Sequence, residues 1–354
     1  MNALARSVVI VLLAASTSFA SDISWRIVGG GGYDTNPAGY AVNDPQTLGW
    51  TQLDVEWSER VDPGVFTVHY SGNGYSFVPN GSWSAHEHTI GTRYSDQSLQ
   101  QISWEISAQA KGSWNHPDYE AYSFRELGVN GSITYIARVP VSFTYDATVR
   151  EYTSSPEFNY HQHVITGATR HSFATRTAVG VSGEFAYRVY TTRTLDDLFV
   201  DNGGSTSHQY RATGFVSQNI AETVGIRLLG YAQLGSGNNR WRDDYWQVLG
   251  DPLATSGFGG RLQLSWLAPF SVTLRPYLAF DRTNETYVNE LGYDSERLDR
   301  RVSGGTIVES SLPWLVADRL VRFTVDAGAK RQRSSDPLYT YEQISVLFGL
   351  RYAW

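Results

Sequence analysis

The chain contains no cysteine among its 354 residues, and its only methionine is the initiator. Without cysteine there is no disulfide framework, no thiol nucleophile and no thiolate metal site. The 28 basic side chains are outnumbered by 35 acidic ones, and the net charge of −7 argues against a nucleic-acid-binding protein. The chain is rich instead in Gly, Trp and Tyr, with 33, 11 and 22 of them. A soluble helical protein rarely has this composition.

The first 20 residues have the pattern of a secretory signal peptide. Arg6 supplies the positive charge, Val8–Ala15 is a short apolar run, and Ala20 is a small residue before the expected cleavage site. The mature chain is therefore predicted to start at Ser21 and to be exported. No later segment has about 18 uninterrupted apolar residues, so we predict no transmembrane helix.

The rest of the chain alternates between apolar and polar residues with a period of two, which is typical of β-strands. In the segment 319–332, for example, Val321, Phe323 and Val325 take one face. Sixteen such segments are predicted: 25–34, 48–60, 65–77, 87–95, 100–113, 122–138, 141–153, 162–175, 178–192, 208–219, 223–235, 254–267, 271–283, 300–310, 319–332 and 341–354.

The connections between these segments alternate in length. The short ones are Val61–Gly64, Ser95–Leu99, Val139–Pro140, Arg176–Thr177, Ala221–Glu222, Ala268–Phe270 and Ser311–Asp318, and the long polar ones include Thr35–Thr47, Leu195–Ser207, Ser236–Leu253 and Asn284–Asp299. An even strand number with short turns at one end and long loops at the other is the plan of a bacterial outer-membrane barrel. We therefore predict an all-β transmembrane antiparallel barrel of 16 strands over residues 21–354, with extracellular long loops and both termini in the periplasm. Any plug is expected from Ser236–Leu253 or Asn284–Asp299, because Asn115–Ala121 is too short.

The chain end carries a second signal for a membrane barrel. Gly349, Tyr352 and Trp354 fit a Gly-x-x-aromatic-x-aromatic pattern. The pattern resembles the C-terminal signal that the outer-membrane barrel assembly machinery recognises, so this machinery is an expected partner, together with outer-membrane lipid and lipopolysaccharide. An apolar edge strand that happens to end the chain is the alternative.

A short motif closes the first predicted strand. Gly32–Pro37 reads Gly-Tyr-Asp-Thr-Asn-Pro, which resembles the Gly-Tyr-Asp-x-Asn-Pro opening of the β-barrel porin type 2 family. Members of that family are often encoded beside exopolysaccharide export genes, so the resemblance implies polysaccharide export and partners among the export components. It implies no catalytic residue. The alternative is local: Tyr33 is an aromatic residue at the membrane rim, and Asp34 starts a turn by bonding its own backbone.

Charged residues on the polar face of the strands predict the lining of a pore. The acidic candidates, on the second to seventh strands, are Asp54, Glu56, Glu105, Glu126 and Asp146, against Lys111, Arg138 and Arg150. The basic candidates, on the eleventh to sixteenth strands, are Arg227, Arg261, Arg275, Arg322, Lys330 and Arg351, against Asp281 and Asp326. The two sets would form opposite walls, and the basic wall would govern anions. Alternatively, these charges pair across neighbouring strands and merely fill the interior.

Other candidate chemistry is weaker. The pairs His86/His88 and His161/His163 could each place two ligands on one face of a strand, but no third ligand is apparent. The acidic pairs Asp196-Asp197 and Asp243-Asp244 and the His171-Ser172 pair lack the partners of a catalytic site. We expect no enzyme, no metal and no cofactor. Trp25, Trp57, Trp104, Trp266 and Trp354 are expected in membrane girdles, whereas Trp114, Trp241 and Trp246 lie in or beside loops.

The sequence thus predicts an outer-membrane channel for a hydrophilic solute, with polysaccharide export as the narrower hypothesis. Two alternatives stay open. One is a non-conducting barrel that acts as an adhesin or as a sheath around a partner such as a cytochrome. The other is a barrel hydrolase.

Overall fold

The computed structural model describes residues 21–37, 44–81, 84–191, 206–237, 252–288, 294–311 and 320–353. The predicted signal peptide, Trp354, and the loop residues Asp196-Asp197, Trp241, Asp243-Asp244 and Trp246 lie outside the described residues. In the described part of the chain, no helix is long and apolar enough to cross a membrane.

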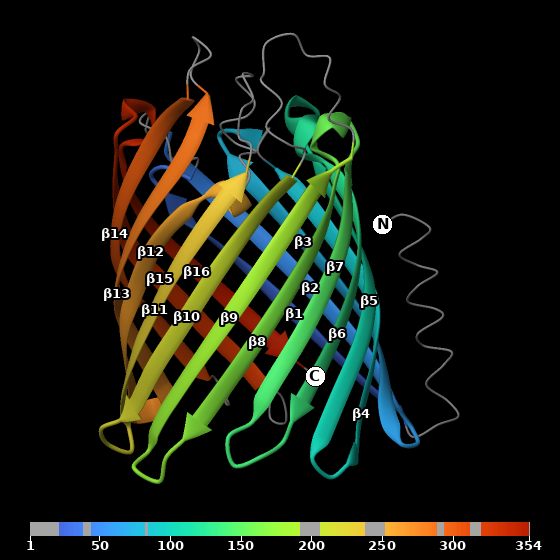
Figure 1. Ribbon diagram of the computed structural model, residues 1–354. Helices are drawn as coiled ribbons and strands as arrows, with labels where there is room; N and C mark the ends of the chain where they lie inside the picture. The colour runs from blue at the N-terminus through green and yellow to red at the C-terminus, as the bar shows by residue number, and fades with distance from the viewer. Residues whose placement is uncertain are drawn as a thin grey trace.

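Sixteen antiparallel strands form one closed barrel, as predicted (Figure 1). The strands are β1 Ser21–Asp34, β2 Gln46–Val61, β3 Gly64–Val78, β4 Ala85–Leu99, β5 Ile102–Asn115, β6 Phe124–Tyr135, β7 Val141–Tyr152, β8 Tyr160–Ser172, β9 Thr177–Tyr190, β10 Thr206–Asn219, β11 Val224–Gly237, β12 Ser256–Ala268, β13 Val272–Val288, β14 Asp294–Ser311, β15 Leu320–Ser334 and β16 Tyr341–Ala353. Each strand pairs with its neighbours in sequence, and β1 pairs with β16 to close the sheet. Closure leaves no strand edge with unpaired backbone groups.

From β1 to β14 the connections alternate in length as the sequence predicts, whereas the connection 312–319 is longer than its neighbours 289–293 and 335–340. At one end of the barrel they are residues 62–63, 100–101, 136–140, 173–176, 220–223 and 269–271. At the other end, four connections contain short 3-10 helices: η2 Pro117–Tyr122, η3 Pro156–Phe158, η4 Pro252–Ala254 and η6 Pro337–Tyr339. The first residue of β1 and the last residue of β16 lie at the end with the short connections, at the bottom of Figure 1.

Three details of the prediction are wrong. The segment Asn284–Asp299 is not a long loop, because β13 continues to Val288 and β14 begins at Asp294. Ionic contacts support the longer hairpin: the Arg297 guanidinium bonds Glu285 and lies 3.2 Å from Asp299, while its carbon lies 3.8 Å from the centre of the Tyr339 ring.

The other two errors concern strand ends. The expected turn Ser95–Leu99 belongs to β4, where an irregular register between Asp96 and Leu99 delays the turn to residues 100–101. The sixth strand ends at Tyr135, so Arg138 lies in the connection to β7 and not on a strand. There its carbonyl oxygen lies 3.3 Å from His171 Nδ1.

Candidate functional site

The strands present two chemically different faces. On one face, large apolar side chains are exposed, among them Leu127, Phe143 and Phe348 with exposed fractions of 64%, 59% and 53%. The other face carries most of the ion pairs and borders both recesses described below. A monomeric soluble protein rarely exposes so much apolar surface, so the apolar face is the outer one and the charged face lines the interior.

Aromatic residues gather on the outer face near the end with the short connections. The rings of Trp25 and Tyr352 are 5.1 Å apart, and those of Tyr94 and Trp104 are 5.3 Å apart. Trp57 and Trp266 share this face and also lie near the short-connection ends of β2 and β12. The placement agrees with the girdle expected from the sequence for these tryptophans.

On the interior face of β1 to β7, cations meet carboxylates. Arg26 lies 2.6 Å from Asp54, and Lys111 lies 2.9 Å from Glu87. Arg93 lies between two acids, 3.6 Å from Glu56 and 3.9 Å from Glu105. The pairs Arg26–Asp54, Lys111–Glu87 and Arg93–Glu105 join neighbouring strands, and Arg93–Glu56 reaches from β4 across β3 to β2. Each pair cancels charge at the wall.

The fourth cation of this region, Arg150 on β7, is the most enclosed. Its Nε donates to Glu126 Oε2 at 2.8 Å, and its Nη2 bonds the same oxygen. The guanidinium carbon also lies 4.0 Å from the centre of the Phe124 ring. The side chain of Glu126 is only 9% exposed, so its charge depends on Arg150 for compensation. We call the interior face of β1 to β7 the paired wall.

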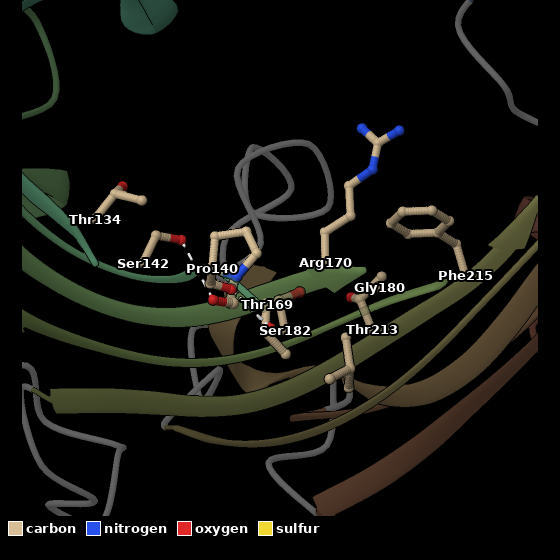
Figure 2. A pocket seen from close by; sticks show the side chains of 11 residues that line it. Thr134, Pro140, Ser142, Thr169, Arg170, Gly180, Ser182, Thr213 and Phe215 are labelled. Carbon is tan, nitrogen blue, oxygen red and sulfur yellow. Dashed lines mark hydrogen bonds between the residues drawn. The ribbon is translucent and has the colours of Figure 1, made fainter. Parts of the chain in front are cut away.

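On the interior face of β8 to β12, arginines lie against aromatic rings instead. Phe215 on β10 has two of them, with the guanidinium carbons of Arg227 and Arg170 at 4.7 Å and 5.8 Å from its ring centre. Figure 2 shows Arg170 extending away from the wall beside Phe215. Both border a recess of about 330 Å³ that is also lined by the hydroxyl-bearing residues Thr134, Ser142, Ser182 and Thr213.

The same contact recurs further along this wall. Arg211 lies 4.8 Å from the Tyr231 ring, and Arg261 lies 4.0 Å from the Tyr277 ring. In the described residues, none of Arg170, Arg211, Arg227 and Arg261 has a carboxylate within ion-pairing distance. A ring face attracts a cation but carries no net charge, so the contact with the ring does not cancel the positive charge. We call the interior face of β8 to β12 the ring wall.

Glycines on neighbouring strands make room for these rings. Gly180 lies in one hydrogen-bonding row with Arg170 and Phe215, and a Cβ atom at Gly180 would overlap the Phe215 ring. In the same way, a Cβ atom at Gly259 would lie 2.6 Å from the Tyr231 ring. The rings therefore lie along the wall and do not fill the space between the walls. This is one structural reason for the high glycine content.

The predicted pore-lining residues divide between these environments. Asp54, Glu56, Glu105, Glu126 and Arg275 form ion pairs, with Arg275 3.0 Å from Glu309, and Asp146 accepts a bond from Asn130. Arg227, Arg261, Arg322, Lys330 and Arg351 have no carboxylate within ion-pairing distance in the described part of the chain. All of them lie on the interior face, and their role as a pore lining stays a prediction.

The sequence prediction missed several interior charges. These are Arg26, Glu87, Arg93, Arg170, Glu184, Arg188, Arg211, Arg301 and Glu309. On β4 the signal was weak because the outer face is also polar near its loop end, with His86 and His88. Arg170 and Arg211 were visible as polar positions of clearly alternating strands and could have been included.

The histidine pairs lie on the outer face. His88 Nδ1 is 2.7 Å from the Tyr70 hydroxyl, and His163 Nδ1 is 2.7 Å from the Tyr145 hydroxyl, while His86 stacks on Trp114 at 5.6 Å. No group of three or more His, Asp or Glu side chains in the described residues could hold a metal ion. These histidines take part in an aromatic layer toward the long-loop end.

The Gly32–Pro37 motif has local contacts of its own. Asp34 accepts from the backbone N–H of Asn36 at 2.8 Å, which is the turn expected under the local alternative. The Gln343 side chain on β16 also donates to Asp34, at 2.7 Å. Asp34 therefore joins the first turn to the strand that closes the barrel.

Solved structures with this fold are outer-membrane porins. Acinetobacter baumannii OccAB1 matches with a TM-score of 0.57 and 9% identity over 94% of this chain and 96% of that one. Pseudomonas aeruginosa OpdL matches with a TM-score of 0.56 and 10% identity over 95% and 99%. P. aeruginosa OccK2 (OpdF) in complex with glucuronate gives 0.56 and 9% over 94% and 96%. No family model and no curated protein matches the chain. At these identities the likeness shows the porin fold, and the resemblance to the β-barrel porin type 2 family finds no support.

Proposed function

We propose that the protein is an outer-membrane channel for hydrophilic solutes with a preference for anions. The closed barrel supports a membrane location, since its outer face is an apolar band with an aromatic girdle. Sixteen strands leave space for an aqueous interior. The proposal of anion preference rests on the arginines of the ring wall, which have no carboxylate within ion-pairing distance in the described residues, because charges that line a pore set its selectivity.

Conductance across a planar lipid bilayer in a salt gradient tests this function. The wild type should conduct, with a reversal potential on the anion-selective side. Arg261→Glu combined with Arg322→Glu places two negative charges on the interior face and should shift the preference toward cations. Arg331→Glu is the control, since Arg331 lies on the outer face of the same strand as Arg322 and is 58% exposed.

The possible outcomes separate the candidate functions. A conducting pore whose ion preference does not move in the double variant contradicts the assignment of the interior charges. Absence of conductance from folded wild-type protein, with folding checked by heat-modifiable migration, favours the sheath or adhesin alternative.

Passage of an exported polysaccharide is the narrower proposal. It rests on the resemblance of Gly32–Pro37 to the β-barrel porin type 2 family. Deletion of the gene should reduce extracellular polysaccharide, and unchanged polysaccharide would contradict export. We also propose, from the barrel architecture and independently of polysaccharide export, that the barrel assembly machinery recognises Gly349, Tyr352 and Trp354 and that the barrel contacts lipopolysaccharide.

A further inference from the structure

A second recess opens in the barrel interior at the seam where β1 meets β16. It has a volume of about 260 Å³ and is lined by Val28, Trp50, Thr324, Asp326, Leu347, Phe348, Gly349 and Arg351. Drug-sized ligands occupy pockets of about 300–1,000 Å³, so this recess suits a ligand of about one small ring. Its two charged residues, Asp326 and Arg351, lie on β15 and β16, outside the paired wall.

One hydrogen-bonding row builds this recess. Trp50 on β2 faces Gly30, Gly30 faces Gly349 on β16, and Gly349 faces Thr324 on β15. Cβ atoms at Gly30 and Gly349 would lie 2.8 Å and 3.0 Å from the six-membered ring of the Trp50 indole. The indole therefore lies over the backbone of two strands, and its other side is turned toward the interior.

Two opposite charges flank the row. Asp326 lies two residues beyond Thr324 on β15, and Arg351 lies two residues beyond Gly349 on β16. In the described residues, Asp326 has no ion pair or hydrogen bond, and the buried Nε of Arg351 finds no acceptor. Both therefore keep hydrogen-bonding capacity for a ligand.

The combination restricts the ligand. A purely apolar molecule would leave the acid and the base without polar partners, which is costly. A small inorganic anion would make no use of Trp50, Val28 and Leu347. A sugar ring has an apolar C–H face for the indole and hydroxyl groups at its edge that can donate to Asp326 and accept from Arg351.

We propose that this recess is a binding site for a neutral pyranose, which stacks on Trp50 and bonds Asp326 and Arg351. The inference names a solute class for the proposed channel and rests on that function, but the binding itself needs no ion flow. A site of this kind in the wall would slow sugars in preference to other solutes of similar size.

Saturation-transfer NMR on the full-length protein in a non-glycosidic detergent tests the site. The probe is methyl β-D-glucopyranoside, and the control ligand is sorbitol, which has hydroxyl groups but no ring face. The wild type should transfer saturation to the ring C–H protons of the glucoside and several-fold less to sorbitol. Trp50→Leu should weaken glucoside binding on the order of tenfold, through loss of the stacking surface.

Two variants complete the design. Trp57→Leu removes a tryptophan from the outer face of the same strand and should leave binding unchanged. Asp326→Asn, on another strand, should weaken binding several-fold and provides a second test if Trp50→Leu does not fold. Equal glucoside binding by wild type and by the folded Trp50 or Asp326 variants overturns the proposal, as does a wild type that binds sorbitol equally well.

The same protein in a planar bilayer separates this proposal from the proposed function. Glucoside binding without conductance would leave the site in place and reject the channel. Conductance without preferential glucoside binding would leave the channel and reject the site.

Discussion

The paired wall and the ring wall hold their cations in opposite ways. On β1 to β7, the four interior cations Arg26, Arg93, Lys111 and Arg150 each lie within 4 Å of a carboxylate. On β8 to β12, four arginines lie against Phe215, Tyr231 or Tyr277. A carboxylate cancels the charge that it binds, whereas a ring only orients it. The paired wall therefore holds the strands together, and the ring wall supplies positive charge to the interior.

Removal of Arg150 should be the most damaging change of this comparison. Arg150→Met leaves the Glu126 carboxylate enclosed without a counter-charge, and we expect a loss of about 2 kcal/mol in the free energy of unfolding. Arg227→Met on the ring wall leaves only a ring uncovered, and should cost about 0.5–1 kcal/mol. Urea unfolding of the detergent-solubilised variants measures both.

A double variant checks the physical reason for the first effect. Glu126→Gln in the Arg150→Met background removes the unpaired charge and should recover part of the lost stability. Equal losses for Arg150→Met and Arg227→Met would remove the stated difference between the two walls.

A smaller effect is expected from the ring itself. Phe215→Ala removes the contact with Arg170 and Arg227 and exposes Gly180, and we expect a loss of about 1 kcal/mol because the ring is only partly buried. Both positive charges stay in place, so the ion preference should be retained. Unfolding midpoints and reversal potentials of this variant give the two readouts, and a lost anion preference would show that the ring does more than orient the arginines.

The smallest change needs no mutation. The Debye length falls from about 10 Å at 0.1 M salt to about 3 Å at 1 M. If the arginines of the ring wall act on ions across the interior, the anion preference should weaken between these concentrations at a constant gradient ratio. A preference that is constant over this range would point to a tight binding site and away from a charged wall.

The period-two pattern predicted the barrel well, because lipid-facing and interior residues must alternate on every crossing. It failed at 284–299 since this segment is polar on both faces, and only the contacts of Arg297 with Glu285 and Asp299 show why the hairpin continues. The same reason hid Arg93 on β4. The period-two pattern depends on a difference in polarity between the two faces of a strand. This difference disappears where a strand extends beyond the apolar band that faces lipid.

The contacts of the interior were less predictable than the strands. The sequence indicated which charges share a face, but not that Arg227 would lie on Phe215 or that Trp50 would cross Gly30 to reach Gly349. Such contacts depend on the register between neighbouring strands, which cannot be read from the lengths of the loops.

The central claim is that the arginines of the ring wall set the ion preference. Two double variants, each of which replaces two charged side chains by neutral ones, test it most directly. Arg227→Gln with Arg261→Gln removes two positive charges from the ring wall, whereas Glu126→Gln with Arg150→Gln removes one opposite pair from the paired wall. Reversal potentials in the same salt gradient should show reduced anion preference in the first variant and the wild-type value in the second. An unchanged reversal potential in Arg227→Gln with Arg261→Gln would contradict the account.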